Sequence, residues 1–427
     1  MKPLSRRTFL TSAAFAPSAL AAERRLRVAA IYTVLRHRSH AQNILENFLQ
    51  PYLFNGKIID PGMDVVSFFA DQREPEGDRT DEIARKFGIP VHKSIRDALT
   101  LGGKELACDA VLLIGEHGDY PMNKLGQVEY PRKRFFDEIV AVLREFKRPV
   151  PIFNDKHLSY RWDWSKQMFD TAKELRIPLM AGSSVPLAQR LPSVELPAGS
   201  EIEEIVSVHG GNPEGYDFHA FEVLQSLVED RKGGETGVSS VEFLSGEAVW
   251  KAGDAGRRPI ALAREAMAAE LGDRKHDLRD PIGREKAAEP HAVLLTYKDG
   301  LKGMILKLGQ NSNRWNVAVK LKNAAPKRIR FFNGPWGNRN LFMALSHAIQ
   351  AFFRSGQSPY PVERTLLASG VVDAAMHSAA EGKVIATPHL EMKYTAVDFR
   401  EYRETGESWK MVEKRVEDKH LHTLGKK

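Results

Sequence analysis

Short apolar runs alternate with segments of helical periodicity along the first half of the chain. The 3.6-residue period predicts helices over 40–53, 80–88, 94–101, 135–146 and 164–176. The intervening apolar runs have strand length and read LRVAAIY, MDVVSFFAD, DAVLLIGE, PVPIFND and IPLMAGSS. Strands joined by helices of this length pair in parallel through right-handed crossovers. The sequence therefore predicts an α/β fold that begins with a doubly wound parallel sheet over residues 24–184.

The pattern changes after Pro186, where most apolar runs follow one another without a helix between them. Strands are predicted over 201–209, 239–247, 291–298, 301–308 and 316–322, and helices over 216–229, 341–355 and 362–381. The Asp299-Gly300 pair between two of these strands is a hairpin signal. Residues 185–427 are thus predicted to form an α+β domain with an open, mostly antiparallel sheet.

The first 22 residues have the three parts of a secretory signal peptide. Lys2, Arg6 and Arg7 supply positive charge, an apolar stretch follows, and Ala19-Leu20-Ala21 resembles a cleavage site. The run SRRTFL adds the paired arginines that the twin-arginine machinery recognises. The apolar stretch is too short for a membrane anchor, which takes about 20 residues. We expect the protein to be exported folded, to the periplasm or the medium.

Charge and cysteine content exclude some classes of function. Three of the seven net positive charges lie in the leader, and the remaining basic residues are interleaved with acidic ones, which argues against a nucleic-acid surface. Cys108 is the single cysteine, so no intramolecular disulfide is possible, and its apolar neighbours indicate a buried core thiol.

The turn after the first predicted strand lacks the glycines of a dinucleotide-binding loop. Its sequence from Tyr32 to Ala41 is YTVLRHRSHA. The layout resembles the Gfo/Idh/MocA family of oxidoreductases, whose motif G-x-G-x-x-G-x-x-H-A places its glycines at Tyr32, Val34 and His37. Asp71, which ends the second long strand, stands at the family's ribose-binding acid. The resemblance implies a Rossmann-like first domain.

Later motifs extend the resemblance to about residue 390. Asp155 to Ser159 is similar to the family's E-K-P-L-A motif, and Gly215 to Glu222 is similar to D-x-G-x-H-x-x-D. The resemblance implies an enzyme acting on a sugar or polyol, with Lys156 polarising the oxygen of the reacting carbon and His219 moving its proton. The acid that orients this histidine in the family is replaced by Gly215. Glu214, Asp217 or Glu222 could take its place, and we name Glu222 because it lies on the same helical face as His219.

The resemblance implies NAD or NADP as the cofactor, with contacts from Tyr32, His37, Asp71 and Glu116. The lost glycines oppose this, because a β-branched Val34 disfavours the close backbone approach that a pyrophosphate needs. Two hypotheses therefore stay open. One is an NAD(P)-dependent sugar or polyol oxidoreductase, and the other is a cofactor-free relative that binds a carbohydrate or catalyses elimination or isomerisation.

Substrate contacts are expected where strands end, since ligands of open α/β sheets bind at the carboxyl edge. The candidates at strand ends are His117, Asp119, Tyr120 and His209. Trp162 is a further candidate because a sugar ring could stack on its aromatic face. The alternatives are solvated loops for the first four, a helix-packing ring for Trp162 and a core position for His219. We also considered His117, His209 and His219 with Glu116 as metal ligands, but their spacing matches no ligand motif, so no metal is predicted.

The expected partners follow from these assignments. They are a small carbohydrate or polyol, the twin-arginine export machinery and further copies of this chain. Nucleic acid is not expected, and no membrane span is predicted after the leader.

Overall fold

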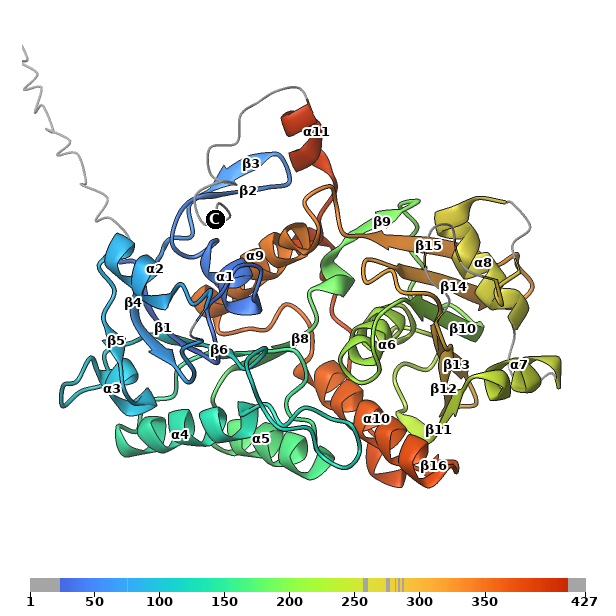
Figure 1. Ribbon diagram of the computed structural model, residues 1–427, viewed down its shortest axis with the longest axis horizontal. Helices are drawn as coiled ribbons and strands as arrows, with labels where there is room; N and C mark the ends of the chain where they lie inside the picture. The colour runs from blue at the N-terminus through green and yellow to red at the C-terminus, as the bar shows by residue number, and fades with distance from the viewer. Residues whose placement is uncertain are drawn as a thin grey trace, which may run out of the picture.

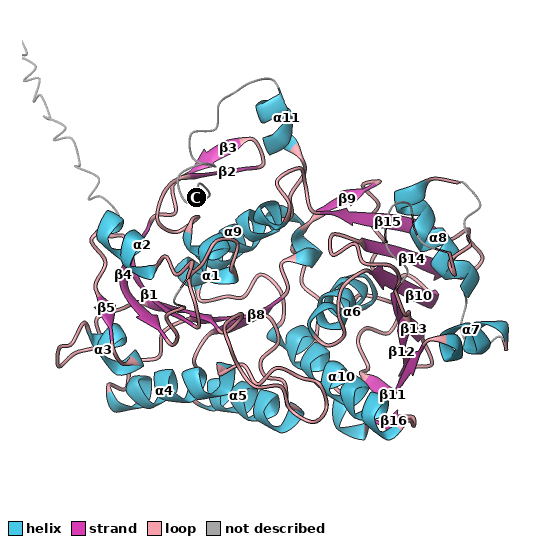
Figure 2. Cartoon of the chain, viewed as in Figure 1, coloured by secondary structure: helices cyan, strands magenta, loops and turns pink. Residues whose placement is uncertain are grey.

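The computed structural model describes residues 24–413 apart from 75, 256–259, 274–276, 281, 283–284 and 286–287. The predicted leader lies outside the described residues. Two sheets lie side by side with helices between and around them (Figures 1 and 2).

The first sheet is parallel and six-stranded, in the order β5-β4-β1-β6-β7-β8. Side chains alternate between its faces, so that Val28 and Ala30 of the central strand join one core while Ala29 and Ile31 join the other. This confirms the predicted doubly wound sheet. Its strands are β1 (Leu26–Tyr32), β4 (Met63–Ala70), β5 (Val91–His92), β6 (Ala110–Ile114), β7 (Ile152–Asp155) and β8 (Leu179–Gly182).

Helices cover both faces of the first sheet. One face carries α1 (His40–Leu45), α2 (Thr80–Phe87) and α9 (Asn338–Ser355), and the other carries α3 (Ile95–Thr100), α4 (Arg132–Glu145) and α5 (Trp162–Glu174) (Figure 1). Although α9 lies late in the chain, its Phe342 and Leu345 share a core with the strands of the first sheet. The first domain therefore incorporates a helix from the second half of the sequence.

The helix predicted over 40–53 is wrong in its length, because α1 ends at Leu45. The chain then forms a two-stranded hairpin from β2 (Tyr52–Phe54) and β3 (Lys57–Ile59). Pro51 cannot donate the backbone hydrogen bond that a continuing helix needs. Asn55 and Gly56, both with positive φ (47° and 76°), make the tight turn.

The second sheet has eight strands in the order β16-β11-β12-β13-β10-β14-β15-β9. It is mostly antiparallel, as predicted, and the Asp299-Gly300 hairpin joins β12 to β13. One pair, β10 with β13, is parallel. Its strands are β9 (Gln189–Leu191), β10 (Ile202–His209), β11 (Val238–Ser245), β12 (His291–Tyr297), β13 (Lys302–Lys307), β14 (Trp315–Leu321), β15 (Lys327–Phe332) and β16 (Ile385–Ala386).

Two long helices lie between the sheets, α6 (Gly215–Val228) and α10 (Val362–Glu381) (Figure 1). They pack on the inner face of the second sheet, while α7 (Glu247–Asp254) and α8 (Ile260–Leu271) cover its outer face. A short helix, α11 (Glu407–Glu413), ends the described chain. None of the helices in the described part of the chain is long and apolar enough to cross a membrane.

Candidate functional site

A buried group of polar side chains lies where the ends of β6 and β7 meet α6. Glu116 follows β6, Lys156 follows β7, and His219 comes from α6; all three are less than 10% exposed. The Lys156 ammonium lies 3.1 Å from a carboxylate oxygen of Glu116, whose other oxygen accepts a hydrogen bond from Arg132. We call Glu116, His117, Arg132, Lys156 and His219 the Lys156 cluster.

The backbone of the Lys156 cluster is held in an uncommon conformation. Lys156 and His117 have positive φ angles of 64° and 72°, and Glu214, which precedes α6, has 62°. Residues with side chains adopt this region rarely, and such strain persists where the surrounding structure fixes it, commonly at functional sites. Asn154 fixes the turn at Lys156 by donating to the carbonyl oxygen of His157 at 3.1 Å.

Lys156 reaches across to the second domain. A Cβ atom added to Gly215 would lie 3.6 Å from the Lys156 nitrogen, so the amine rests against the first residue of α6. At Gly215, where the similar family carries an acid, the Lys156 amine therefore lies against the backbone of α6.

His219 is oriented by Ser183, which follows β8. Its Nδ1 lies 2.6 Å from the Ser183 hydroxyl, and its ring meets Trp315 edge to face at 5.5 Å. Burial, together with the nearby charges of Lys156 and His40, holds the pKa of His219 well below its usual value. The imidazole is thus neutral near pH 7, as a residue that takes up a proton must be.

Glu222 does not orient His219 directly, contrary to the sequence-based prediction. Its carboxylate accepts hydrogen bonds from the Ser183 backbone N–H (3.2 Å) and from the Thr365 hydroxyl (2.6 Å). Ser183 thus stands between the two predicted partners. Burial raises the pKa of Glu222 to about 7.

Several neighbours of the cluster were not predicted as site residues, although Glu214 was one of the possible orienting acids. His40 Nδ1 lies 2.6 Å from an Asp155 oxygen, and His157 Nε2 lies 3.1 Å from Glu214. His40, Asp155 and His157 lie inside the motifs that resemble the family. Their place in these motifs could have indicated that they belong to the site. Arg132 stood in no motif.

Two of the four predicted cofactor contacts, Tyr32 and Glu116, are buried side chains. Tyr32 is fully buried in the core, where its ring packs against Phe68 at 5.6 Å, and Glu116 belongs to the Lys156 cluster. His37 is exposed on the loop before α1. Val34, at the second glycine position, is also fully buried.

The loop after β4 is hydrogen-bonded to the loop after β6. The Gln72 side chain exchanges two hydrogen bonds of 2.8 Å with the backbone of Asp119, and Tyr120 donates to Asp71 at 2.7 Å. Arg134 donates to the other oxygen of Asp71 at 2.6 Å. We call these contacts among Asp71, Gln72, Asp119, Tyr120 and Arg134 the clasp.

The clasp joins the strands on either side of β1, where a dinucleotide's pyrophosphate lies in this kind of fold. Asp71, expected to bind ribose, is engaged by protein groups, and α1 is a helix of six residues whose first turn is capped by Ser39. The residues present do not fit a nicotinamide dinucleotide in that pose. Asp119 and Tyr120, which were predicted as substrate contacts, form the hydrogen bonds of the clasp.

Two further substrate candidates lie away from the Lys156 cluster. Trp162 packs on α10, with its ring against the Gly370 position and 5.2 Å from His389, so it is the helix-packing ring of the alternative interpretation. His209 is fully buried and bonded to Asp217 at 2.9 Å. His117 does lie in the cluster, with its ring 5.0 Å from that of His40.

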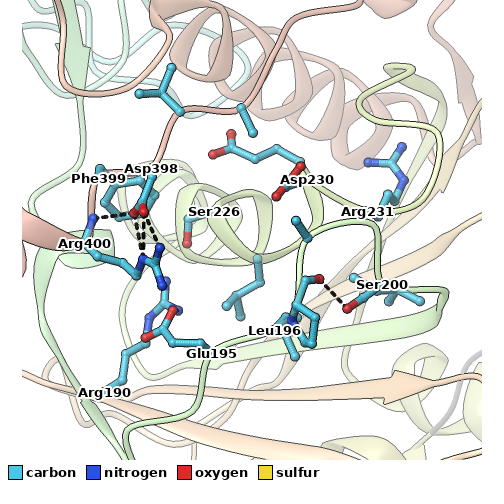
Figure 3. A pocket seen from close by; sticks show the side chains of 17 residues that line it. Arg190, Glu195, Leu196, Ser200, Ser226, Asp230, Arg231, Asp398, Phe399 and Arg400 are labelled. Carbon is cyan, nitrogen blue, oxygen red and sulfur yellow. Dashed lines mark hydrogen bonds and ion pairs between the residues drawn. The ribbon is translucent and has the colours of Figure 1, made fainter.

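A surface pocket elsewhere lies at the other end of α6, between residues 190–202 and 396–400 (Figure 3). Four of its charged groups pair within the pocket, in the bonds from Arg400 to Asp398 (2.8 Å) and from Arg190 to Glu195 (3.0 Å). Seven residues of helix, about 10 Å, separate His219 from Ser226 in its wall. We assign no function to this pocket.

No protein-family model and no curated protein matches the sequence. Solved structures do match in fold. Myo-inositol 2-dehydrogenase from Lactobacillus plantarum aligns over 85% of this chain and 99% of its own, with a TM-score of 0.52 and 11% identity. GenD2 from gentamicin A biosynthesis, solved in complex with NAD, aligns over 87% and 99%, with a TM-score of 0.55 and 12% identity. Apo scyllo-inositol dehydrogenase from Lactobacillus casei aligns over 85% and 98%, with a TM-score of 0.53 and 10% identity.

Proposed function

We propose that this chain, which has the two-domain fold of the Gfo/Idh/MocA-type oxidoreductases, acts on a sugar or polyol at the Lys156 cluster. The observation that carries the proposal is a buried lysine of positive φ that lies beside Glu116 and against the helix of His219. Two of the similar structures are named as inositol dehydrogenases, which supports a polyhydroxylated substrate.

The chemistry that we infer is proton transfer at a carbon next to a carbonyl group. Neutral His219 takes the proton, and the electrons of the C–H bond move into an enediolate. The Lys156 ammonium donates a hydrogen bond to the oxygen on which negative charge develops. In an isomerisation, the proton of the adjacent hydroxyl passes to the oxygen that carries the negative charge, and His219 returns its proton to the neighbouring carbon. In an elimination, His219 gives its proton to a hydroxyl on the next carbon, the C–O bond breaks and water leaves.

Glu116 and Arg132 support this assignment through charge. Burial would raise the pKa of Glu116, but the charges of Lys156 and Arg132 hold it well below its usual value, so the carboxylate stays ionised. The Glu116 carboxylate lies 3.1 Å from the Lys156 nitrogen and positions that group as a hydrogen-bond donor.

A second candidate is the NAD(P)-dependent oxidoreductase that the resemblance implies. The NAD complex of GenD2 and the shared fold favour it. The clasp and the buried Val34 oppose it, so we place it behind the redox-free reaction.

Deuterium incorporation tests the proposal. The full chain is incubated in D₂O with a panel of aldoses, ketoses and oxidised inositols, and exchange at carbon is followed by NMR. We expect exchange with at least one compound, reduced about 10²- to 10⁴-fold in Lys156→Ala and His219→Gln. Lys166→Ala, which removes an exposed lysine paired with Asp170, is the matched control and should keep full activity.

Two results would overturn this view in different ways. Reduction of NAD or NADP by any sugar would establish the second candidate instead. Saturable sugar binding without exchange or redox turnover would indicate a binding protein.

We further infer that the protein functions outside the cytoplasm, on the strength of the twin-arginine leader. Replacing both leader arginines, Arg6→Lys with Arg7→Lys, should retain the protein in the cytoplasm. Cell fractionation with immunoblotting measures this, and unchanged export would contradict the inference.

A further inference from the structure

Two histidines and an aspartate meet inside the second domain, at a place that the proposed function does not use. His209 ends β10, His291 begins β12, and Asp217 lies in the first turn of α6. Both histidines are in register with Lys307 of the intervening strand β13, so they stand on one face of the sheet. They are 0% and 5% exposed, and Asp217 is 1% exposed.

The three side chains converge on one point. Asp217 Oδ1 lies 2.9 Å from His209 Nε2 and 2.8 Å from His291 Nε2, and the three ligand atoms lie within 4.8 Å of one another. Two imidazole nitrogens and one carboxylate oxygen form the donor set of many iron(II) and zinc sites that keep positions open for other ligands.

Asp217 is a buried carboxylate that lies between two imidazole rings. The amine of Lys307 donates to the carbonyl oxygen of Glu289 at 2.7 Å. A buried carboxylate is costly unless it is paired with a cation or coordinates a metal ion.

The surroundings hold the ligands in place. The ring of His291 stacks on Phe243 at 5.1 Å, and the ring of His209 is parallel to that of Trp315 at 6.3 Å. The second oxygen of Asp217 accepts the backbone N–H of Glu214 at 3.2 Å. Fixed ligand orientation of this kind is typical of metal sites. A metal ion would replace the two hydrogen bonds between Asp217 and the histidines. With the ion on Nε2 the His209 proton moves to Nδ1, so the 3.3 Å contact from the Gly211 N–H is given up as well.

We propose that His209, Asp217 and His291 bind a divalent transition-metal ion such as Zn²⁺. The ion fastens the first turn of α6 to β10 and β12. Because His219 follows Asp217 by two residues on that helix, the metal also fixes the position from which His219 projects. The site stands whether or not the sugar chemistry is correct.

Metal titration of the full chain, prepared without a histidine tag and freed of metal with a chelator, tests the proposal. We expect calorimetry to show one equivalent of Zn²⁺ bound, with affinity at least about 100-fold lower in Asp217→Asn and His291→Gln. Both variants keep the size of the side chain. His347→Gln removes a half-buried histidine that contacts Tyr52 in the first domain, and it should bind Zn²⁺ as the unaltered protein does.

A second measurement does not depend on the variants folding. Co²⁺ added to the unaltered protein should give ligand-field absorption of a nitrogen and oxygen site, and one equivalent of Zn²⁺ should abolish it. The proposal is overturned if the folded protein binds no Zn²⁺, or if folded Asp217→Asn binds it equally well. It is likewise overturned if Co²⁺ shows only the spectrum of the hydrated ion.

Discussion

The clasp and the Lys156 cluster lie next to each other at the carboxyl edge of the first sheet, but they differ in how far their charged groups are buried. After β4, Asp71 accepts hydrogen bonds from Tyr120 and Arg134, and these clasp contacts join the loops that follow β4 and β6, on either side of β1. At the ends of β6 and β7, Glu116 and Lys156 stay buried as charged groups that face the second domain.

The difference lies in the cost of each arrangement. Clasp contacts involve partly exposed groups, such as Arg134 with 47% of its side chain exposed, and cost little to form. The Lys156 cluster contains Arg132 with a fully buried side chain, and buried ion pairs often fail to recover their desolvation. Apolar side chains could fill the space of the Lys156 cluster at a lower cost in free energy. The presence of buried charges there therefore suggests a function.

Two arginines on α4 give the sharpest test of this contrast. Arg132→Met keeps the apolar stem but removes one of the two cations that neutralise Glu116. We expect the free energy of unfolding to fall by about 3 to 5 kcal/mol, because a buried charge loses a partner. Urea denaturation measures this.

The same substitution two residues later is the control. Arg134→Met removes a partly exposed partner of Asp71 and should cost no more than about 1 kcal/mol. Equal losses from the two variants would contradict the distinction between cluster and clasp.

The pH dependence of stability sharpens the comparison further. Burial lowers the pKa of His117 to about 4, from about 6.5 in the unfolded chain. The folded state therefore disfavours the protonated ring. The contribution of neutral His117 to the free energy of unfolding is fully present above about pH 6.5 and is lost progressively as the pH falls to about 4. At 1.36 kcal/mol for each pKa unit, this loss amounts to about 3 kcal/mol.

His117→Gln should make this part of the stability profile less steep, by up to about 3 kcal/mol, while other buried histidines such as His219 keep their share of the slope. The free energy of unfolding is compared at about pH 7 and about pH 4.5 for both proteins. His377→Gln, on the exposed side of α10, should keep the original slope. If His117→Gln keeps it too, His117 is not the group that resists protonation.

Much of the fold follows from local patterns, and the limits of that prediction are physical. The alternation of apolar runs and helices predicted the parallel sheet, and the solved structures confirm the resembling family at the level of fold. The parallel pairing of β10 with β13 could not be predicted, because it depends on how distant segments meet. Short edge strands such as β9 and β16 carry too few residues to show a period.

The site was predictable where a motif carried it. Lys156 and His219 stood in motifs, and the structure places both at one cluster. The partnership of Asp217 with His291 spans 74 residues, and that of Gln72 with Asp119 spans 47, so sequence spacing carried no sign of either. Ser183 was missed because a serine hydroxyl beside a strand end has many ordinary uses.

The smallest effect on stability is expected from variants that ask whether the clasp or Val34 prevents dinucleotide binding. Tyr120→Phe removes one hydrogen bond to Asp71 and should cost about 1 kcal/mol of stability. Adding Gln72→Ala opens the rest of the link to Asp119. We expect the double variant still to give no rise in NADH fluorescence, because Val34 remains buried where glycine would let a pyrophosphate approach. Saturable NADH binding by the double variant would instead show that the clasp alone excludes the dinucleotide, and would return the redox hypothesis to first place.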